Sequence, residues 1–321
     1  MKKIFAVILP LIIAAVIFMT ACTTKPSDST DTLTGEPVLS GETLNIGILP
    51  AESAIPIIIA FEMGYFEEAG LDVSIKAFSS PNDRNVAVQA KELDGVIGDV
   101  MTCAAFVDHG IAMKITSDIS EDFKILSSPN SGVTEMSGLA DKKVSLVKNF
   151  ILEYIMDQFA NDGGFTYEIV EIPSFSGRAE ALMSDQVDAV LFTEPQAGML
   201  AQQGAHILGS SKDAGIKGGT FMFTDEAITE RAGDIKAFYK GCSKAVDYMN
   251  STEVEEYSDI LAQYQFPDAI AGYLSGLYGT FQHAGVIPQD QFESIIAWTL
   301  DKGLITKSYT YDELTDFSYI K

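Results

Sequence analysis

Short hydrophobic runs of strand length alternate with helix-like segments along most of this 321-residue chain, and this alternation limits what the chain can fold into. Strands that are joined through helices run parallel, in a sheet whose two faces the helices cover. The expected strands form two successive sets, at residues 44–49, 71–78, 96–100 and 112–116 and then at 143–147, 167–172, 189–193 and 205–208. The sequence therefore predicts two α/β units, followed from about residue 225 by a mostly helical segment.

The two predicted units carry a similar pair of charged residues. Arg84 precedes Asp94 by ten positions, and Arg178 precedes Asp188 by the same interval. An internal duplication would produce this spacing, and so would a chance similarity between two units of the same type. Both interpretations give two α/β units, and the sequence does not decide between them.

The N-terminus has the pattern of an export signal. Two lysines precede an uncharged run that ends near Met19 and is short for a membrane-spanning helix. The sequence Met-Thr-Ala-Cys at residues 19–22 resembles a bacterial lipobox, which implies cleavage before Cys22 and acylation of that cysteine. A plain signal peptide with an incidental cysteine is the alternative. We expect a signal peptide over residues 1–21 and a lipid-anchored flexible linker over residues 22–42, because the linker has few bulky apolar residues.

The charge balance excludes several classes of partner. The chain has 21 basic and 45 acidic residues, which gives a formal net charge of -24 at pH 7. This charge repels the phosphates of nucleic acids and anionic lipid headgroups. The three cysteines cannot form a disulfide scaffold, and none has the spacing of a zinc site. Cys103 and Cys242 could form one disulfide in an exported protein or remain buried thiols.

Four stretches resemble one protein family, at residues 60–73, 93–99, 137–144 and 186–195. They are similar to the extracytoplasmic solute-binding proteins of bacterial ABC importers for nitrate, sulfonates, taurine and thiamine-type pyrimidines. The resemblance implies the type 2 periplasmic-binding-protein fold, an α/β architecture in which two lobes hold the ligand in a cleft between them. The segments that cross between the lobes would fall near residues 125–128 and 220–224. Lobe I would then comprise residues 43–126 and 222–321, and lobe II residues 127–221.

The resemblance also implies a function. A binding protein of this kind closes its lobes around a solute and presents the closed form to a membrane permease, which a separate ATPase drives. We therefore expect an exported, monomeric lipoprotein that acts as the substrate-binding protein of an ABC transporter, without a cofactor and without a metal. Nucleic acid is not an expected partner.

The location of the solute can be predicted from the strands. In doubly wound sheets, ligands bind beyond the carboxyl ends of the strands, where helix N-termini supply free N–H donors. The residues at these positions are Glu52, Ser53, Phe78, Ser79, Ser80, Asp99 and Thr102 in the first unit and Asn149, Phe150, Ser174, Phe175, Thr193 and Glu194 in the second. Ser53, Ser79, Ser80 and Glu194 could instead cap helices, and the phenylalanines could belong to the core. Arg84 and Arg178 could contact the solute directly or pair with nearby carboxylates, and we favour the pairing.

Two chemistries remain open for the solute. Acids at strand ends beside phenylalanines suit a small heteroaromatic amine related to pyrimidines or thiamine precursors. Serine, threonine, arginine and helix N-termini suit a sulfonate, taurine or nitrate, and these groups are present as well. The prediction favours the first chemistry.

Catalysis is the competing class of function. A cytosolic pyrimidine-precursor synthase resembles these binding proteins, and it uses pyridoxal phosphate, iron and a cysteine-rich motif. Cys103 has no neighbouring cysteine, and the expected export separates the chain from that cofactor. The chain also lacks the G-x-x-x-x-G-K-[ST] and G-x-S-x-G motifs of nucleotide hydrolysis and of α/β-hydrolases. We therefore predict binding rather than catalysis.

Overall fold

A computed structural model of the chain describes residues 38–267 and 270–320. The expected signal peptide, the acylated Cys22 and the linker up to residue 37 lie outside the described residues. Within the described ranges, no helix is both long enough and apolar enough to cross a membrane. All described residues belong to one compact unit.

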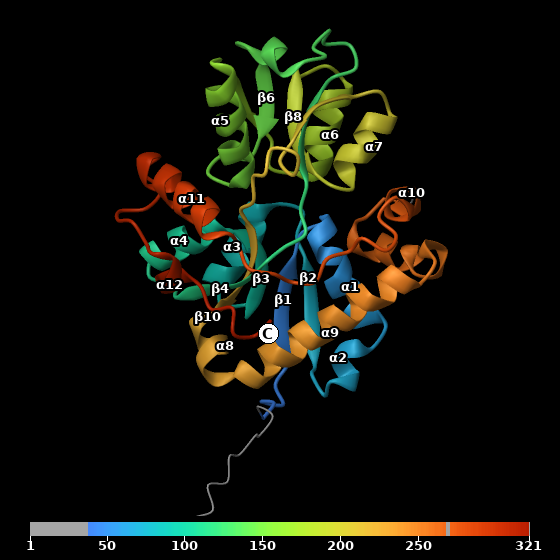
Figure 1. Cartoon of the computed structure of the whole chain (residues 1–321), viewed down its shortest axis with the longest axis vertical. Helices are drawn as coiled ribbons and strands as arrows, with labels where there is room; N and C mark the ends of the chain where they lie inside the picture. The colour runs from blue at the N-terminus through green and yellow to red at the C-terminus, as the bar shows by residue number, and fades with distance from the viewer. Residues whose placement is uncertain (1–37, 268–269, 321) are drawn as a thin grey trace, which may run out of the picture. The chain divides into compact units, whose positions relative to one another are not determined.

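The first sheet contains five strands in the order β2-β1-β3-β10-β4 (Figure 1). Strand β1 pairs in parallel with β2 and β3, while β10 runs antiparallel to β3 and β4. The strands are β1 (Leu44–Ile48), β2 (Val73–Ala77), β3 (Gly95–Asp99), β4 (Met113–Asp118) and β10 (Gly219–Thr224).

The second sheet repeats this arrangement in the order β7-β6-β8-β5-β9. Strand β6 pairs in parallel with β7 and β8, and β5 runs antiparallel to β8 and β9. The strands are β5 (Phe123–Ser127), β6 (Lys143–Leu146), β7 (Glu168–Glu171), β8 (Ala189–Thr193) and β9 (His206–Ser210). The eight strands expected from the sequence lie within two residues of their predicted bounds.

Helices cover both sheets and form most of the chain after β10, as the sequence predicts (Figure 1). The α-helices are α1 (Ile55–Glu62), α2 (Tyr65–Glu68), α3 (Pro81–Gln89), α4 (Val100–Asp108), α5 (Ile151–Gly163), α6 (Phe175–Met183), α7 (Gln196–Gln202), α8 (Asp225–Glu230), α9 (Ala232–Ser251), α10 (Ile270–Ser275), α11 (Gln289–Asp301) and α12 (Tyr311–Leu314). Four short 3-10 helices are η1 (Glu52–Ala54), η2 (Met136–Leu139), η3 (Val254–Glu256) and η4 (Ser258–Tyr264).

The chain passes between the two sheets at residues 119–122 and 211–218, which we call the crossing segments. The crossings were expected at residues 125–128 and 220–224, but strands β5 and β10 occupy these positions, each hydrogen-bonded to a neighbour on both sides. Both strands enter a sheet directly from a crossing segment. The alternation of helix-like and strand-like segments, which predicts the other strands, is therefore interrupted before them. We call residues 38–118 with 219–320 the first half and residues 123–210 the second half.

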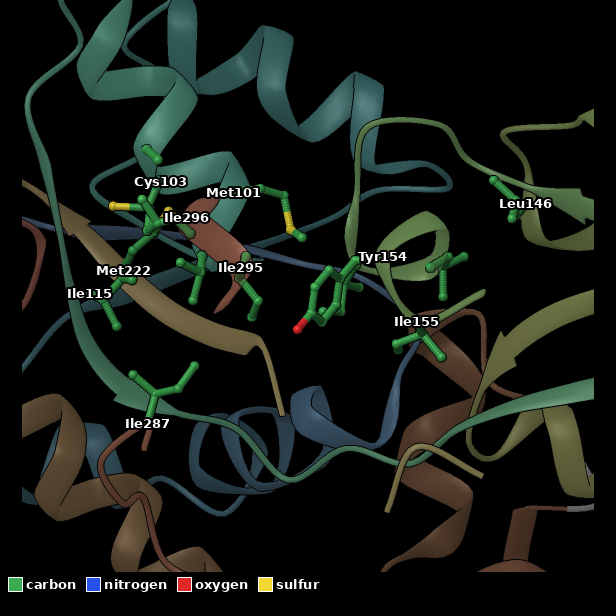
Figure 2. Packing of buried hydrophobic residues seen from close by; sticks show 14 of the residues in the cluster. Met101, Cys103, Ile115, Leu146, Tyr154, Ile155, Met222, Ile287, Ile295 and Ile296 are labelled. Carbon is green, nitrogen blue, oxygen red and sulfur yellow. The ribbon is translucent and has the colours of Figure 1, made fainter. Parts of the chain in front are cut away.

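The two halves share part of their hydrophobic core. One cluster of buried side chains contains Met101 and Cys103 of α4, Tyr154 and Ile155 of α5, and Ile295 of α11 (Figure 2). Cys103 and Cys242 are both free thiols, and burial raises the pKa of the Cys103 thiol to about 12. Of the two alternatives for these cysteines, the structure has the thiols rather than a disulfide.

Candidate functional site

A cavity of about 70 Å³ lies where strands of both sheets end. Leu49 follows β1 and Asp99 ends β3, while Val147 follows β6 and Thr193 ends β8, and all four residues line the cavity. A volume of this size holds about five water-sized spheres, so the two halves border a space for a small solute. The cavity therefore lies beyond the carboxyl ends of these strands, which is where ligands bind in doubly wound sheets. We call this relation the carboxyl-end rule.

Five of the thirteen predicted solute-binding residues line the cavity: Ser53, Asp99, Phe150, Phe175 and Thr193. The other eight do not line it: Glu52, Phe78, Ser79, Ser80, Thr102, Asn149, Ser174 and Glu194. No bound solute tests either group, so the predicted contacts remain predictions.

Two of the serines outside the cavity cap helices, and for Ser80 the sequence left this alternative open. The hydroxyl of Ser80 accepts from the backbone N–H of Asp83 at the start of α3, at 3.2 Å. The hydroxyl of Ser174 accepts from Gly177 N–H at the start of α6, at 3.1 Å. These caps fix where each helix begins behind its strand.

Asp99 joins the two halves. Its Oδ1 accepts from the backbone N–H of Thr102 at 2.8 Å and so caps α4. Its Oδ2 accepts from Ile151 N–H at 3.2 Å, and Ile151 is the first residue of α5 in the second half. Burial raises the pKa of this carboxyl, although the positive charge of Arg84 and the hydrogen bonds act in the opposite direction.

Arg84 and Arg178 line the cavity and are buried, at 1% exposure each. The expected pairing with carboxylates is not present: the described ion pairs of arginine involve Arg231 alone. Arg84 donates to the carbonyl of Ile97 at 2.6 Å, and Arg178 donates to the carbonyl of Ile172 at 3.0 Å. Burial lowers the pKa of each guanidinium to about 10. The negative charge of Asp99 partly offsets the cost of burial for Arg84, whereas burial is the only influence on the pKa of Arg178, so a ligand that supplies an acceptor would stabilise Arg178.

Arg178 packs against two neighbouring aromatic rings. Its guanidinium carbon lies 4.8 Å from the ring centre of Phe192 and 5.1 Å from that of Phe175. Among the residues that the structure describes, none accepts a hydrogen bond from its buried Nε. The side chain therefore has one unused donor beside the cavity.

Glu121 also lines the cavity, although the sequence interpretation did not select it. Its Oε1 accepts from the backbone N–H groups of Gly218 and Gly219 at 2.9 and 2.8 Å. Its Oε2 is buried and has no hydrogen-bond partner in the described part of the chain. Burial raises the pKa of this carboxyl to about 7. Glu121 lies in a crossing segment rather than directly after an expected strand, so the carboxyl-end rule could not find it.

A group of contacts beside the cavity also connects the halves. Glu52 N–H donates to the carbonyl of Glu194 at 2.9 Å, and the side-chain amide of Gln196 donates to the carbonyl of Pro50 at 2.5 Å. The carboxylate of Glu194 pairs with Lys124 and accepts from Gly198 N–H in α7, as expected of a helix cap. These contacts connect the first half to the second half.

A larger cavity of about 840 Å³ extends along α9. Ser53 and Ile119 line both cavities, and the larger one continues past Tyr65 and Lys240 to Tyr319. None of its described lining residues belongs to the second half. We take the smaller cavity as the candidate site because both halves build it and buried charged groups face it.

Comparisons with known proteins agree with this geometry. The family model described as NMT1/THI5 like matches residues 52–255. The 4-amino-5-hydroxymethyl-2-methylpyrimidine phosphate synthase THI11 of Saccharomyces cerevisiae is 26% identical over 257 residues, which cover 71% of this chain and 76% of the relative.

Two solved structures have the same fold. One is the alkanesulfonate-binding protein SsuA from Xanthomonas axonopodis pv. citri bound to MOPS, with a TM-score of 0.73, 15% identity and coverage of 85% of this chain and 98% of that chain. The other is the zinc-bound ligand-binding component of an ABC-type import system from Staphylococcus aureus. Its TM-score is 0.72 and its identity 13%, and the match covers 87% of this chain and 98% of that chain. The expected periplasmic-binding-protein fold is therefore confirmed.

Proposed function

This chain belongs to the NMT1/THI5-like family, and from that premise we propose that it captures a small organic solute between its two halves. The observation that carries the proposal is the cavity at the strand ends, which residues of both halves line. In this proposal the halves act as the two lobes, and the crossing segments act as the hinge. A solute that contacts both lobes favours the closed arrangement, because only that arrangement provides all of its contacts.

The captured solute would be delivered to an ABC permease and its ATPase. The likeness to the ligand-binding component of an ABC-type import system supports this step. We further propose that the protein is exported as a monomer and remains on the outer face of the cell membrane through a lipid on Cys22. Residues 22–42 would then act as the tether between the lipid and the first strand.

The preferred solute is a heteroaromatic amine of the pyrimidine or thiamine-precursor type. Two carboxyl groups, those of Asp99 and Glu121, line the cavity and can accept hydrogen bonds from amine N–H groups. The rings of Phe150 and Phe175 line the same space and can contact a flat ring. The similarity to synthases of a phosphorylated aminopyrimidine supports the same class.

A sulfonate or a similar anion is the second candidate. The buried Arg178, whose Nε has no described partner, favours it, because guanidinium groups form strong hydrogen bonds with anionic oxygens. The likeness to an alkanesulfonate-binding protein supports it as well.

Synthase chemistry is a third candidate, favoured by the similarity to the yeast synthases. An enzyme that uses pyridoxal phosphate holds that cofactor through a Schiff base with a lysine. No lysine is among the described residues that line the cavity. The cavity residues therefore do not fit this cofactor, and we propose binding without catalysis.

A thermal-shift screen tests the proposal on the chain from residue 23. The panel contains aminopyrimidines, thiamine and its fragments, polyamines, taurine, alkanesulfonates, nitrate and bicarbonate. A ligand at about a thousand times its dissociation constant stabilises the folded state by about 4 kcal/mol. For a chain of this size we expect a rise in Tm of roughly 10 °C. A selective shift with aminopyrimidines supports the preferred class, a shift with sulfonates alone supports the second candidate, and no shift with any compound contradicts solute capture from this panel.

A further inference from the structure

Glu121 connects the two crossing segments. It lies in the segment at residues 119–122, and its Oε1 accepts from Gly218, the last residue of the other segment, and from Gly219, the first residue of β10. The same side chain lines the cavity. One carboxyl group therefore contacts both parts of the proposed hinge and the proposed solute space.

The local backbone leaves room for this carboxyl. A Cβ atom on Gly219 would lie 1.9 Å from Oε2 of Glu121, and a Cβ atom on Gly218 would lie 2.4 Å from Cδ1 of Ile151. A side chain at either position would displace its neighbour. Gly219 therefore permits the close approach of Glu121, while Gly218 permits the close packing of Ile151.

The second oxygen of Glu121 needs a donor. Oε2 is buried, and within residues 38–267 and 270–320 it has no hydrogen-bond partner. Leaving a buried charged acceptor without a donor is costly, whereas a donor inside the cavity would remove that cost. Arg84 and Arg178 line the same cavity, but their described hydrogen bonds go to other acceptors.

Building on the proposed function, we propose that Glu121 is a solute-binding residue whose Oε2 accepts a hydrogen bond from an N–H group of the solute. The bound solute then contacts both crossing segments through one carboxylate, which links capture to the position of the hinge. The site selects solutes that carry an amine or amidine-like donor and discriminates against isosteric solutes without one.

Binding through Glu121 makes the affinity for the solute depend on pH. An N–H donor favours the ionised carboxylate, and burial raises the pKa of Glu121 to about 7 in the solute-free structure. Affinity should therefore increase as the pH rises through this pKa, because less free energy is then needed to remove the proton. The other charged groups near this carboxyl or around the cavity are Asp118, Lys217, Asp99, Arg84 and Arg178.

The experiment measures the affinity of 4-amino-5-hydroxymethyl-2-methylpyrimidine by calorimetry at pH 6 and pH 8, for wild type and Glu121→Gln. For wild type we expect affinity to be about tenfold lower at pH 6, following the ionised fraction of Glu121. At pH 8, Glu121→Gln should bind about 10- to 100-fold more weakly than wild type. Titration of the probe itself affects wild type and Glu121→Gln equally. The difference between the pH profiles of the two proteins therefore reports the titration of Glu121.

Two controls make the outcome specific. Asp122→Asn changes a carboxylate in the same crossing segment that does not line the cavity, so the pH profile should stay that of wild type. The same pyrimidine without its 4-amino group should bind wild type and Glu121→Gln equally. Equal binding of the amine by wild type and Glu121→Gln at both pH values would overturn the role of Glu121 and leave solute capture standing. No binding of any panel compound to wild type would overturn solute capture and this inference together.

Discussion

Asp99 shows how one side chain can stabilise a helix and the closed form together. Its carboxylate caps α4 within the first half and accepts a hydrogen bond from the first residue of α5 in the second half. Asp99→Ala removes both acceptors. We expect the free energy of unfolding to fall by about 1–2 kcal/mol, as for other lost N-caps, and solute affinity to fall as well. Chemical denaturation and calorimetry measure the two effects.

Thr224→Ala provides the matched control for Asp99→Ala. Thr224 caps α8 by accepting from Ala227 N–H at 3.3 Å, and it lies in the first half away from the cavity. Its loss should cost about 1 kcal/mol of stability without changing solute affinity. If Asp99→Ala likewise lowered stability but left affinity unchanged, its bond to α5 would have no part in closure.

The sequence predicts residues of this site where a strand end marks them. Asp99 and Thr193 end strands that the apolar runs reveal, so the carboxyl-end rule selects both. Glu121 and Arg178 follow from no such rule. Glu121 lies in an irregular connection, and the unpaired state of Arg178 depends on which carboxylates surround it in three dimensions. The local hydrophobic pattern predicts where strands end along the chain, whereas the hydrogen-bond partners of a side chain depend on tertiary packing.

At the scale of elements, α5 of the second half and α11 of the first half form a polar contact. Lys302, which directly follows α11, lies 2.8 Å from Oε1 of Glu153 and 2.9 Å from Oδ2 of Asp157, both in α5. The hydroxyl groups of Tyr154 and Ser294 are 2.9 Å apart across the same contact. These helices belong to different halves, so the contact stabilises the present arrangement of the halves, which is the closed form in the proposed function.

Lys302→Ala should therefore weaken solute binding without changing the cavity. Removing the cation leaves two carboxylates of α5 without their partner, which favours separation of the helices. We expect a loss of about 1 kcal/mol, or roughly fivefold in affinity, since the pair is partly solvent-exposed. Calorimetry measures the change. Lys244→Ala, which removes an exposed pair with Glu68 inside the first half, should leave affinity unchanged, and an equal loss in both variants would rule out a specific role for the α5–α11 contact.

The strands differ in how well the sequence predicts them. Eight strands were predictable because each is an apolar run next to a helix-like segment. Strands β5 and β10 were missed as strands because they enter a sheet directly from a crossing segment. Their antiparallel direction follows from the path of the whole chain, which no local pattern encodes.

For the whole molecule, closure should be visible through Trp298. It is the single tryptophan of the chain, and it lies in α11 where the first half contacts the second. Its indole N–H donates to Oδ2 of Asp157 at 2.9 Å, and its ring lies 5.7 Å from that of Tyr154, edge to face. Separation of the halves would break both contacts and expose the indole to water.

We therefore expect solute binding to shift the emission of Trp298 to shorter wavelength, because closure brings the indole back against α5. X-ray scattering should show a smaller radius of gyration under the same conditions. Asp157→Ala removes the acceptor for the indole N–H and should reduce the spectral shift while the scattering change remains. A solute that raises Tm but leaves both the emission and the radius unchanged would show that the halves bind it without closing. The hinge role proposed for the crossing segments would then be wrong, because in the proposed function closure of the halves connects the local contacts of Glu121 and Asp99 to delivery of the solute.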